Sequence, residues 1–153
     1  MSSRTDMLDE IVLRLDEIDG TPDYNYTCRK VTWKDFAMPE SIKHFPVSYV
    51  LIDDSMMTGG ESGNNQQTDR LPVVVWGYVK AEKQPQLVAE NYMADMCKAL
   101  TLNRTSGSLD LSLADTCAAF LIRGKGISGD LLSPYRTVEI LLEVTMRIPI
   151  GTI

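Results

Sequence analysis

Apolar and polar residues alternate along the stretch from Thr137 to Ile148. The positions of one parity are all apolar: Val138, Ile140, Leu142, Val144, Met146 and Ile148. The other parity is mostly polar, with one leucine: Thr137, Glu139, Leu141, Glu143, Thr145 and Arg147. Because successive side chains of a strand point to opposite faces, the pattern predicts a long strand with one buried face. Such a strand, roughly 36 Å long at about 3.3 Å per residue, needs neighbouring strands and a covering layer.

Two segments show the spacing of amphipathic helices. Residues 4–18 carry apolar side chains three and four positions apart, with Ser3 as a possible N-cap and Gly20 as a stop. We expect the polar residues of this segment on its solvent side: Asp6, Asp9, Glu10, Arg14, Asp16 and Glu17. The second helix is expected from Pro85 to about Leu102, since proline fits the first turn of a helix.

The remaining apolar runs predict shorter strands separated by turns. We expect them at Tyr24–Trp33 with a bulge near Arg29–Lys30, at Val47–Ile52, at Leu71–Lys80, at Leu109–Leu113 as a short strand or extended edge, and at Thr116–Gly124. A glycine-rich turn is expected at Lys125–Pro134. The order is helix, three strands, helix, two or three strands. It indicates an α+β fold: a mainly antiparallel mixed sheet of about four to six strands with two helices packed on one face.

The stretch from Asp54 to Arg70 has no hydrophobic period and is rich in Gly, Asn, Gln and Ser. We expect a long flexible loop here, within a single domain that spans residues 1–153. Irregular loops longer than about 12–15 residues are uncommon in compact domains and are usually functional or disordered.

Composition narrows the classes of function. The formal net charge is -6, which disfavours a protein that grips nucleic-acid phosphates over its whole surface. The three cysteines show no C-x-x-C spacing, so we expect free thiols in a reducing compartment rather than disulfides or a zinc site. The first residues lack the apolar core of a signal peptide, and no apolar run approaches the roughly 18 residues of a membrane span.

No motif carries an enzyme signature. Gly124–Gly129 matches G-x-G-x-x-G, but a strand rather than a helix is expected after it, so a hairpin connection is favoured over a nucleotide site. His44 is the only histidine, and a structural or surface role is favoured for it. Asp53 and Asp54 are adjacent on a strand end and point to opposite faces, so they do not form an acid pair. Gly59–Gly60 lacks the Lys-Ser/Thr of a P-loop. We expect neither a cofactor nor a metal.

The order of these segments resembles the tail terminator and tail-completion proteins of long-tailed bacteriophages, the minor tail protein U-like group. Four features over nearly the whole chain carry the likeness: the opening helix to Gly20 with Tyr24-Asn-Tyr26; Phe45-Pro46 and the strand to Asp53 with its polar loop; Pro72–Val79 followed by the helix with Ala94–Leu100; and a final strand pair that ends in Val138–Met146. The turn at Leu102–Ser108 departs from the Leu-Gly-Gly-like turn that is usual in the family.

The resemblance implies a structural virion protein rather than an enzyme. Family members form a ring, usually a hexamer, that caps the finished tail tube, ends its polymerisation and provides a joining surface for the head. The expected partners are further copies of the chain, the tail tube protein and a neck or connector protein. DNA is expected to pass through the lumen without specific binding, and no membrane is involved. The expected location is the head-proximal end of the virion tail, assembled in the host cytoplasm.

The charged and apolar residues of the expected loop and of the outer strand faces are candidates for the assembly interface: Asp54, Met56, Met57, Glu61, Asp69, Arg70, Arg123, Lys125, Glu139, Leu141, Glu143 and Arg147. We expect the loop to become ordered on the tail tube. Removal of Thr58–Gln67 is then expected to leave the ring intact and to abolish capping. Two alternatives stay open: a neck or head-completion protein on the head side of the junction, and a small hydrolase or nucleotide-binding enzyme.

Overall fold

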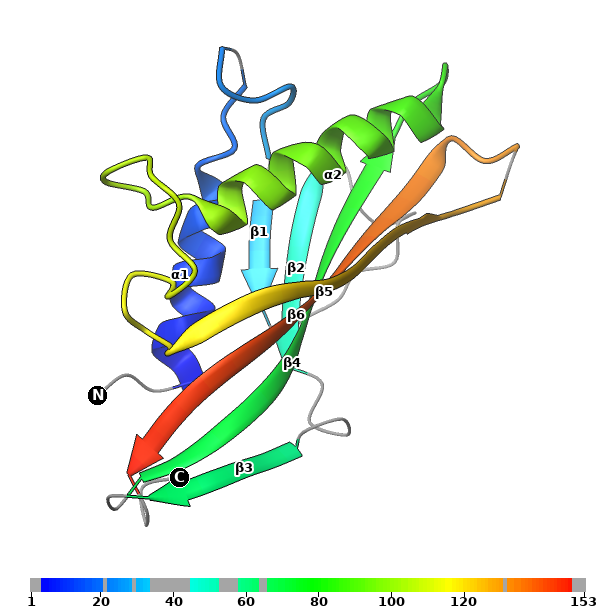
Figure 1. Cartoon of the computed structure of the whole chain (residues 1–153). Helices are drawn as coiled ribbons and strands as arrows, with labels where there is room; N and C mark the ends of the chain where they lie inside the picture. Colours follow the sequence, from blue (N-terminus) through cyan, green and yellow to red (C-terminus); the bar gives the residue numbers. More distant parts are fainter. Residues whose placement is uncertain are drawn as a thin grey trace.

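The computed structural model describes residues 4–20, 22–28, 30–33, 45–52, 58–63, 66–130 and 132–149. They form two helices and six strands in this order (Figure 1): α1 (Arg4–Asp16), β1 (Lys30–Trp33), β2 (Val47–Ile52), β3 (Thr58–Gly63), β4 (Gln66–Lys80), α2 (Pro85–Thr101), β5 (Ala119–Ser128) and β6 (Tyr135–Pro149).

The six strands belong to one mixed sheet with the order β1-β2-β4-β6-β5, and β3 also pairs with β4. Only β1 and β2 are parallel, and the other pairs are antiparallel. Both helices contribute to a single core against the same face of the sheet. The predicted α+β fold, with a mainly antiparallel sheet and two helices on one face, is confirmed.

The closing strand β6 lies between β4 and β5, as its alternating pattern requires. Its inward side chains from Val138 to Met146 are at most 1% exposed. They face the helices together with Leu71, Val73 and Val75 of β4. Burial of one such side chain contributes about 1.5–3 kcal/mol, so this shared apolar face is the main source of the fold's stability.

Helix α2 approaches the sheet closely at one glycine. A Cβ atom at Gly77 would lie 2.7 Å from both Met96 Sδ and Tyr92 Cε2. Tyr92 is fully buried, and its hydroxyl lies 2.6 Å from Ser48 Oγ and 3.2 Å from Cys28 Sγ. The absence of a side chain at Gly77 therefore lets the Tyr92 ring lie against β4 while its hydroxyl forms hydrogen bonds.

The prediction of a loop at residues 54–70 is wrong for the part of that stretch that the structure describes. Thr58–Gly63 forms β3, which pairs antiparallel with Gln66–Arg70 of β4, with a register shift between Gly59 and Ser62. This hairpin lies at the end of the sheet away from α2 (Figure 1). Backbone hydrogen bonds can form such a strand pair with polar side chains. A polar sequence without hydrophobic alternation therefore gives no signal that predicts the pair.

Three further boundaries differ from expectation. Residues 22–28 form turns with a bridge between Asp19 and Thr27, and the strand expected from Tyr24 begins only at Lys30. The region 109–113 is not a strand, because Leu113, Ala114 and Asp115 adopt positive φ angles of 50°, 56° and 63° in a turn. The predicted glycine-rich turn is shorter than expected, since β5 continues to Ser128.

Candidate functional site

One face of the sheet carries the helices, and the opposite face of β4, β6 and β5 is the candidate site. The strand register aligns its outward residues in rows. One row holds Arg70, Thr145 and Ala119 in that order, and the next row holds Pro72, Glu143 and Leu121. Arg147 lies one step further along β6, beside Thr68. These rows form a patch of charged and small side chains with one large apolar residue, Leu121, which is 49% exposed.

A bulge in β5 brings an arginine onto this face. The register of β5 against β6 shifts between Ile122 and Gly124, so Arg123 is the extra residue. Its guanidinium donates two hydrogen bonds to the Glu143 carboxylate, at 3.0 and 3.2 Å. These bonds are the main reason that the pKa of Glu143 is lowered, and the charge of nearby Arg70 acts in the same direction. The carboxylate therefore lies between two guanidinium groups.

The other end of the face is more apolar. Tyr49 and Tyr78 pack with ring centroids 5.4 Å apart, and Tyr49 is only 6% exposed. Leu141 is half-buried and pairs with Val74 of β4. A shallow groove of about 380 Å³ follows the β5–β6 pair. Its floor includes Gly124 and Gly126, where an added Cβ would meet nothing within 4 Å. The face thus combines a charged end and a grooved apolar end on rigid paired strands.

The structure brings together half of the candidate interface residues. Those on the uncovered face are Arg70, Arg123, Glu139, Leu141, Glu143 and Arg147. Asp69 is removed from this surface, because it pairs with Met146 on the helix side of the sheet and is only 5% exposed. Lys125 follows the bulge and also turns to the helix side of the sheet. Burial raises the pKa of the nearby Cys97 thiol, and the charge of Lys125 partly offsets this effect. Asp54, Met56, Met57 and the side chain of Glu61 lie outside the described residues.

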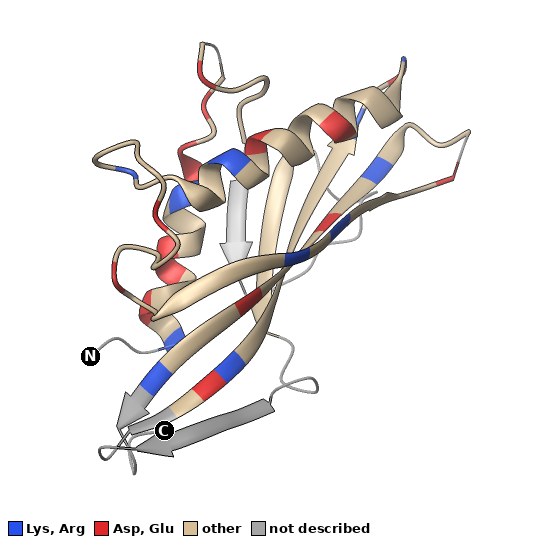
Figure 2. Cartoon of the chain, viewed as in Figure 1, with Lys and Arg blue, Asp and Glu red and all other residues tan. Residues whose placement is uncertain are grey.

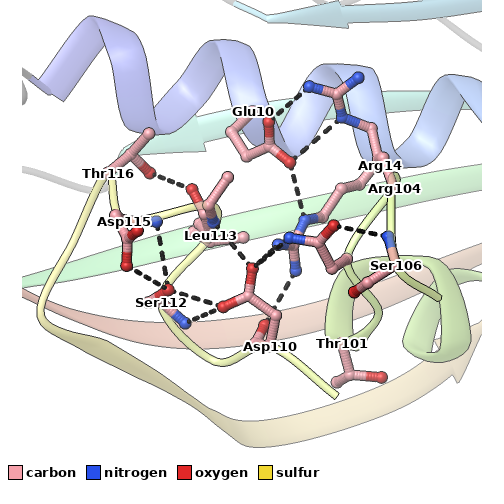
Figure 3. A network of polar contacts seen from close by, with 12 residues as sticks. Glu10, Arg14, Thr101, Arg104, Ser106, Asp110, Ser112, Leu113, Asp115 and Thr116 are labelled. Carbon is pink, nitrogen blue, oxygen red and sulfur yellow. Dashed lines mark hydrogen bonds and ion pairs between the residues drawn. The ribbon is translucent and has the colours of Figure 1, made fainter. Parts of the chain in front are cut away.

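The sequence pattern missed a polar network in the interior (Figure 3). Glu10 and Arg14 were expected on the solvent side of α1, but they are 5% and 0% exposed. Arg14 donates through Nε to Glu10 at 2.9 Å, through Nη1 to the carbonyl oxygens of Leu100 and Asp110 at 2.8 and 3.0 Å, and through Nη2 to the Asp110 carboxylate at 2.7 Å. The spacing of Glu10 and Arg14, four residues apart, was the one signal for this pair.

The groups around Arg14 are held in their charged forms. Burial raises the pKa of Glu10, but hydrogen bonds from Arg104 and Arg14 outweigh it, and the pKa is lowered. Burial also raises the pKa of Asp110, while the hydroxyl and amide of Ser112, the Asn103 amide group and the Ala114 amide lower it much further. The network fixes the turns at 102–116 against α1, and its donors and acceptors are committed to one another. We therefore assign it a structural role.

The geometry of the described residues gives no support to a metal site or a nucleotide site. In the described ranges no group of three His, Cys, Asp or Glu side chains could hold a metal ion. The G-x-G-x-x-G segment lies in β5 and the turn after it and is followed by β6, as expected for a hairpin. His44, Asp53 and Asp54 lie outside the described residues. Among the helices that the structure describes, none is long and apolar enough to cross a membrane.

Comparison with known proteins leaves the family open, since no protein-family model matches the chain and no curated protein was found to match it.

Proposed function

We propose that this chain is a structural protein of a bacteriophage virion. It forms a ring on the end of the tail tube, stops tube polymerisation and provides the surface to which the head is joined. The proposal rests on the resemblance of the chain to tail terminator proteins. The structural observation that supports it is the face of β4, β6 and β5 opposite the helices, where Arg70, Leu121 and Arg123 are exposed and lie in fixed register on paired strands.

This face has the chemical character of a protein-binding surface. Arginine and aromatic residues are enriched in interfaces, and apolar residues surrounded by polar ones mark contact patches. Here Leu121 is exposed beside the Arg123–Glu143 pair, and the half-buried Leu141 lies further along the sheet. Paired strands cost little entropy to order when a partner docks, which suits a protein whose activity is recognition.

Most of the segments that carry the resemblance form the elements expected of them, except that Tyr24-Asn-Tyr26 lies in turns and the described part of the polar loop includes β3. The opening segment forms α1, Phe45-Pro46 leads into β2, Pro72–Val79 lies in β4 ahead of α2, and the final pair is β5–β6. The net charge of -6 supports a conduit through which DNA slides without specific binding, because like charges repel phosphate.

Electron microscopy of the purified protein with tail tubes assembled from the tube protein of the same phage tests the proposal. We expect one ring at one end of each tube, and tubes grown in the presence of the protein should stop lengthening. Decoration along the tube wall, or tubes of unchanged length with bare ends, would contradict the proposal. Binding to isolated connectors but not to tubes would place the protein on the head side of the junction instead.

A further inference from the structure

Charges of opposite sign are separated between two surfaces of the molecule. Figure 2 shows acidic residues along α1 and the loops beside it, while β4, β5 and β6 carry most of the basic positions of the sheet. A chain of net charge -6 thus has a sheet face on which positive charge prevails. The fold produces this separation, because α1 presents its acidic residues on the helix side of the molecule and the strands present their basic residues on the sheet.

The outer side of α1 and the first residue after it form an acidic stripe, defined here as Asp6, Asp9, Leu13, Asp16 and Glu17. At 100° per residue these positions fall within about 100° of arc, so they share one side of the helix. All five side chains are exposed. Leu13 lies near the middle of the stripe and is 45% exposed, which is unusual for a leucine among carboxylates.

The uncovered sheet face has an arginine patch, defined here as Arg70, Arg123, Arg147, Glu143 and Leu121. The patch holds three guanidinium groups and one carboxylate, which is already paired with Arg123 at 3.0 Å. Arg70 and Arg147 are exposed and form no ion pair with another residue of the described ranges. With three arginines and one glutamate, the patch has a net charge of +2 beside an exposed leucine.

We propose that the arginine patch of one copy docks on the acidic stripe of α1 in a second copy. The charges are complementary, and each surface offers one exposed leucine as an apolar anchor. The patch lies on the uncovered face of the sheet and the stripe on the outer side of the helix layer, so the contact joins two different surfaces. Such a heterologous contact leaves a free stripe at one end of a pair and a free patch at the other, and it closes into a ring when the rotation per subunit allows.

This contact deepens the proposed ring and rests on it, since it names the surfaces through which neighbouring subunits meet. Complementary charges at the rim of an interface raise the association rate and set the register, and the leucines exclude water between them. Self-association should therefore weaken strongly at about 1 M salt, where the Debye length is roughly 3 Å.

Charge reversal in two variants tests the contact. R70E/R147E makes the patch acidic, and D9K/D16K makes the stripe basic. Each variant alone should lose self-association by at least about tenfold in Kd, because patch and stripe then carry the same sign. An equimolar mixture should recover association, because the acidic patch of one variant faces the basic stripe of the other. Sedimentation velocity measures all three samples, and circular dichroism checks that each variant is folded.

The variant E82K/E90K is the matched control, since it makes the same change in net charge as D9K/D16K at two exposed positions outside the stripe. It should associate like the wild-type chain. Wild-type assembly that persists in both reversal variants, or a mixture that fails to recover assembly, overturns this contact but leaves the tube-capping proposal standing. A wild-type chain that stays monomeric at all concentrations also overturns the contact, and tube capping is then decided by electron microscopy alone.

Discussion

At the scale of single residues, the most consequential side chain is Arg14. A buried guanidinium is costly to desolvate, and its removal from water is compensated only when its donors find acceptors. Arg14 meets this condition with two carboxylates and two backbone carbonyl groups that come from α1, from the end of α2 and from the turn after it. One residue thus joins segments up to 96 positions apart in the chain.

Replacement of Arg14 by methionine should destabilise the fold by about 3–5 kcal/mol, because the Asp110 carboxylate and the Leu100 carbonyl group lose their partner. Urea denaturation followed by circular dichroism measures the free energy of unfolding. The control is Arg123→Met, which removes the exposed pair with Glu143 and should leave the unfolding midpoint unchanged. Equal effects of the two substitutions would show that the interior network does not stabilise the fold.

Asp110 should make the free energy of unfolding depend on pH in the acidic range. Its pKa is lowered in the folded chain, so the folded state binds its proton less readily than the unfolded state does. The contribution is complete well above the ordinary aspartate pKa of about 3.9, and it declines as the pH falls from about 5 toward the lowered pKa of the folded state. We expect the difference in unfolding free energy between wild-type and Asp110→Asn chains to be largest near pH 7 and to shrink toward pH 3. A difference that does not change with pH would contradict this account.

At the scale of elements, the contact between α2 and the sheet depends on Gly77. Alanine at this position should destabilise the chain by about 1–3 kcal/mol, because its Cβ would overlap the buried Tyr92 ring, which cannot move without losing its hydrogen bonds. Thermal unfolding measures the effect. Gly126→Ala is the matched control in a strand, since its Cβ would enter open space. Destabilisation of similar size at both positions would point to strand conformation rather than helix packing.

Elements with a strong hydrophobic period were predictable from the sequence. Alternation placed β6, apolar spacings of three and four residues placed α1, and Pro85 marked the start of α2. The β3–β4 hairpin was not predictable, because Gly, Ser and Gln give no periodic signal and the ladder is formed by the backbone. Nor were the left-handed residues Leu113 and Ala114, which are uncommon at positive φ and are held by the hydrogen bonds around Asp110.

The candidate surface was predictable only where a residue's face followed from strand alternation. Glu139, Glu143 and Arg147 lie outward as the alternation of β6 requires. The face of Lys125 could not be predicted in this way, because the bulge at Arg123 reverses the alternation of β5. A single sequence gives little indication of a bulge. Asp69 was misplaced because its strand was expected to be a loop.

At the scale of the whole molecule, the β3–β4 hairpin offers a way to separate ring formation from tube capping. Because Gln66 and Gln67 also pair with β6, removal of Thr58–Gly63 alone spares the central sheet. This variant should still form rings by sedimentation velocity and should fail to cap tubes in electron micrographs. Rings that cap tubes at the normal length would show that the hairpin is not the tube-binding element.

The long pairing of β4 with β6 has a mechanical consequence. Each strand has 15 residues, and their register runs without interruption from Gln66 opposite Pro149 to Lys80 opposite Tyr135. A pull along the strand axis loads these hydrogen bonds side by side in shear, so they must break together rather than one after another. The β4–β6 pair should therefore resist extension along its length more strongly than strand pairs that open one hydrogen bond at a time.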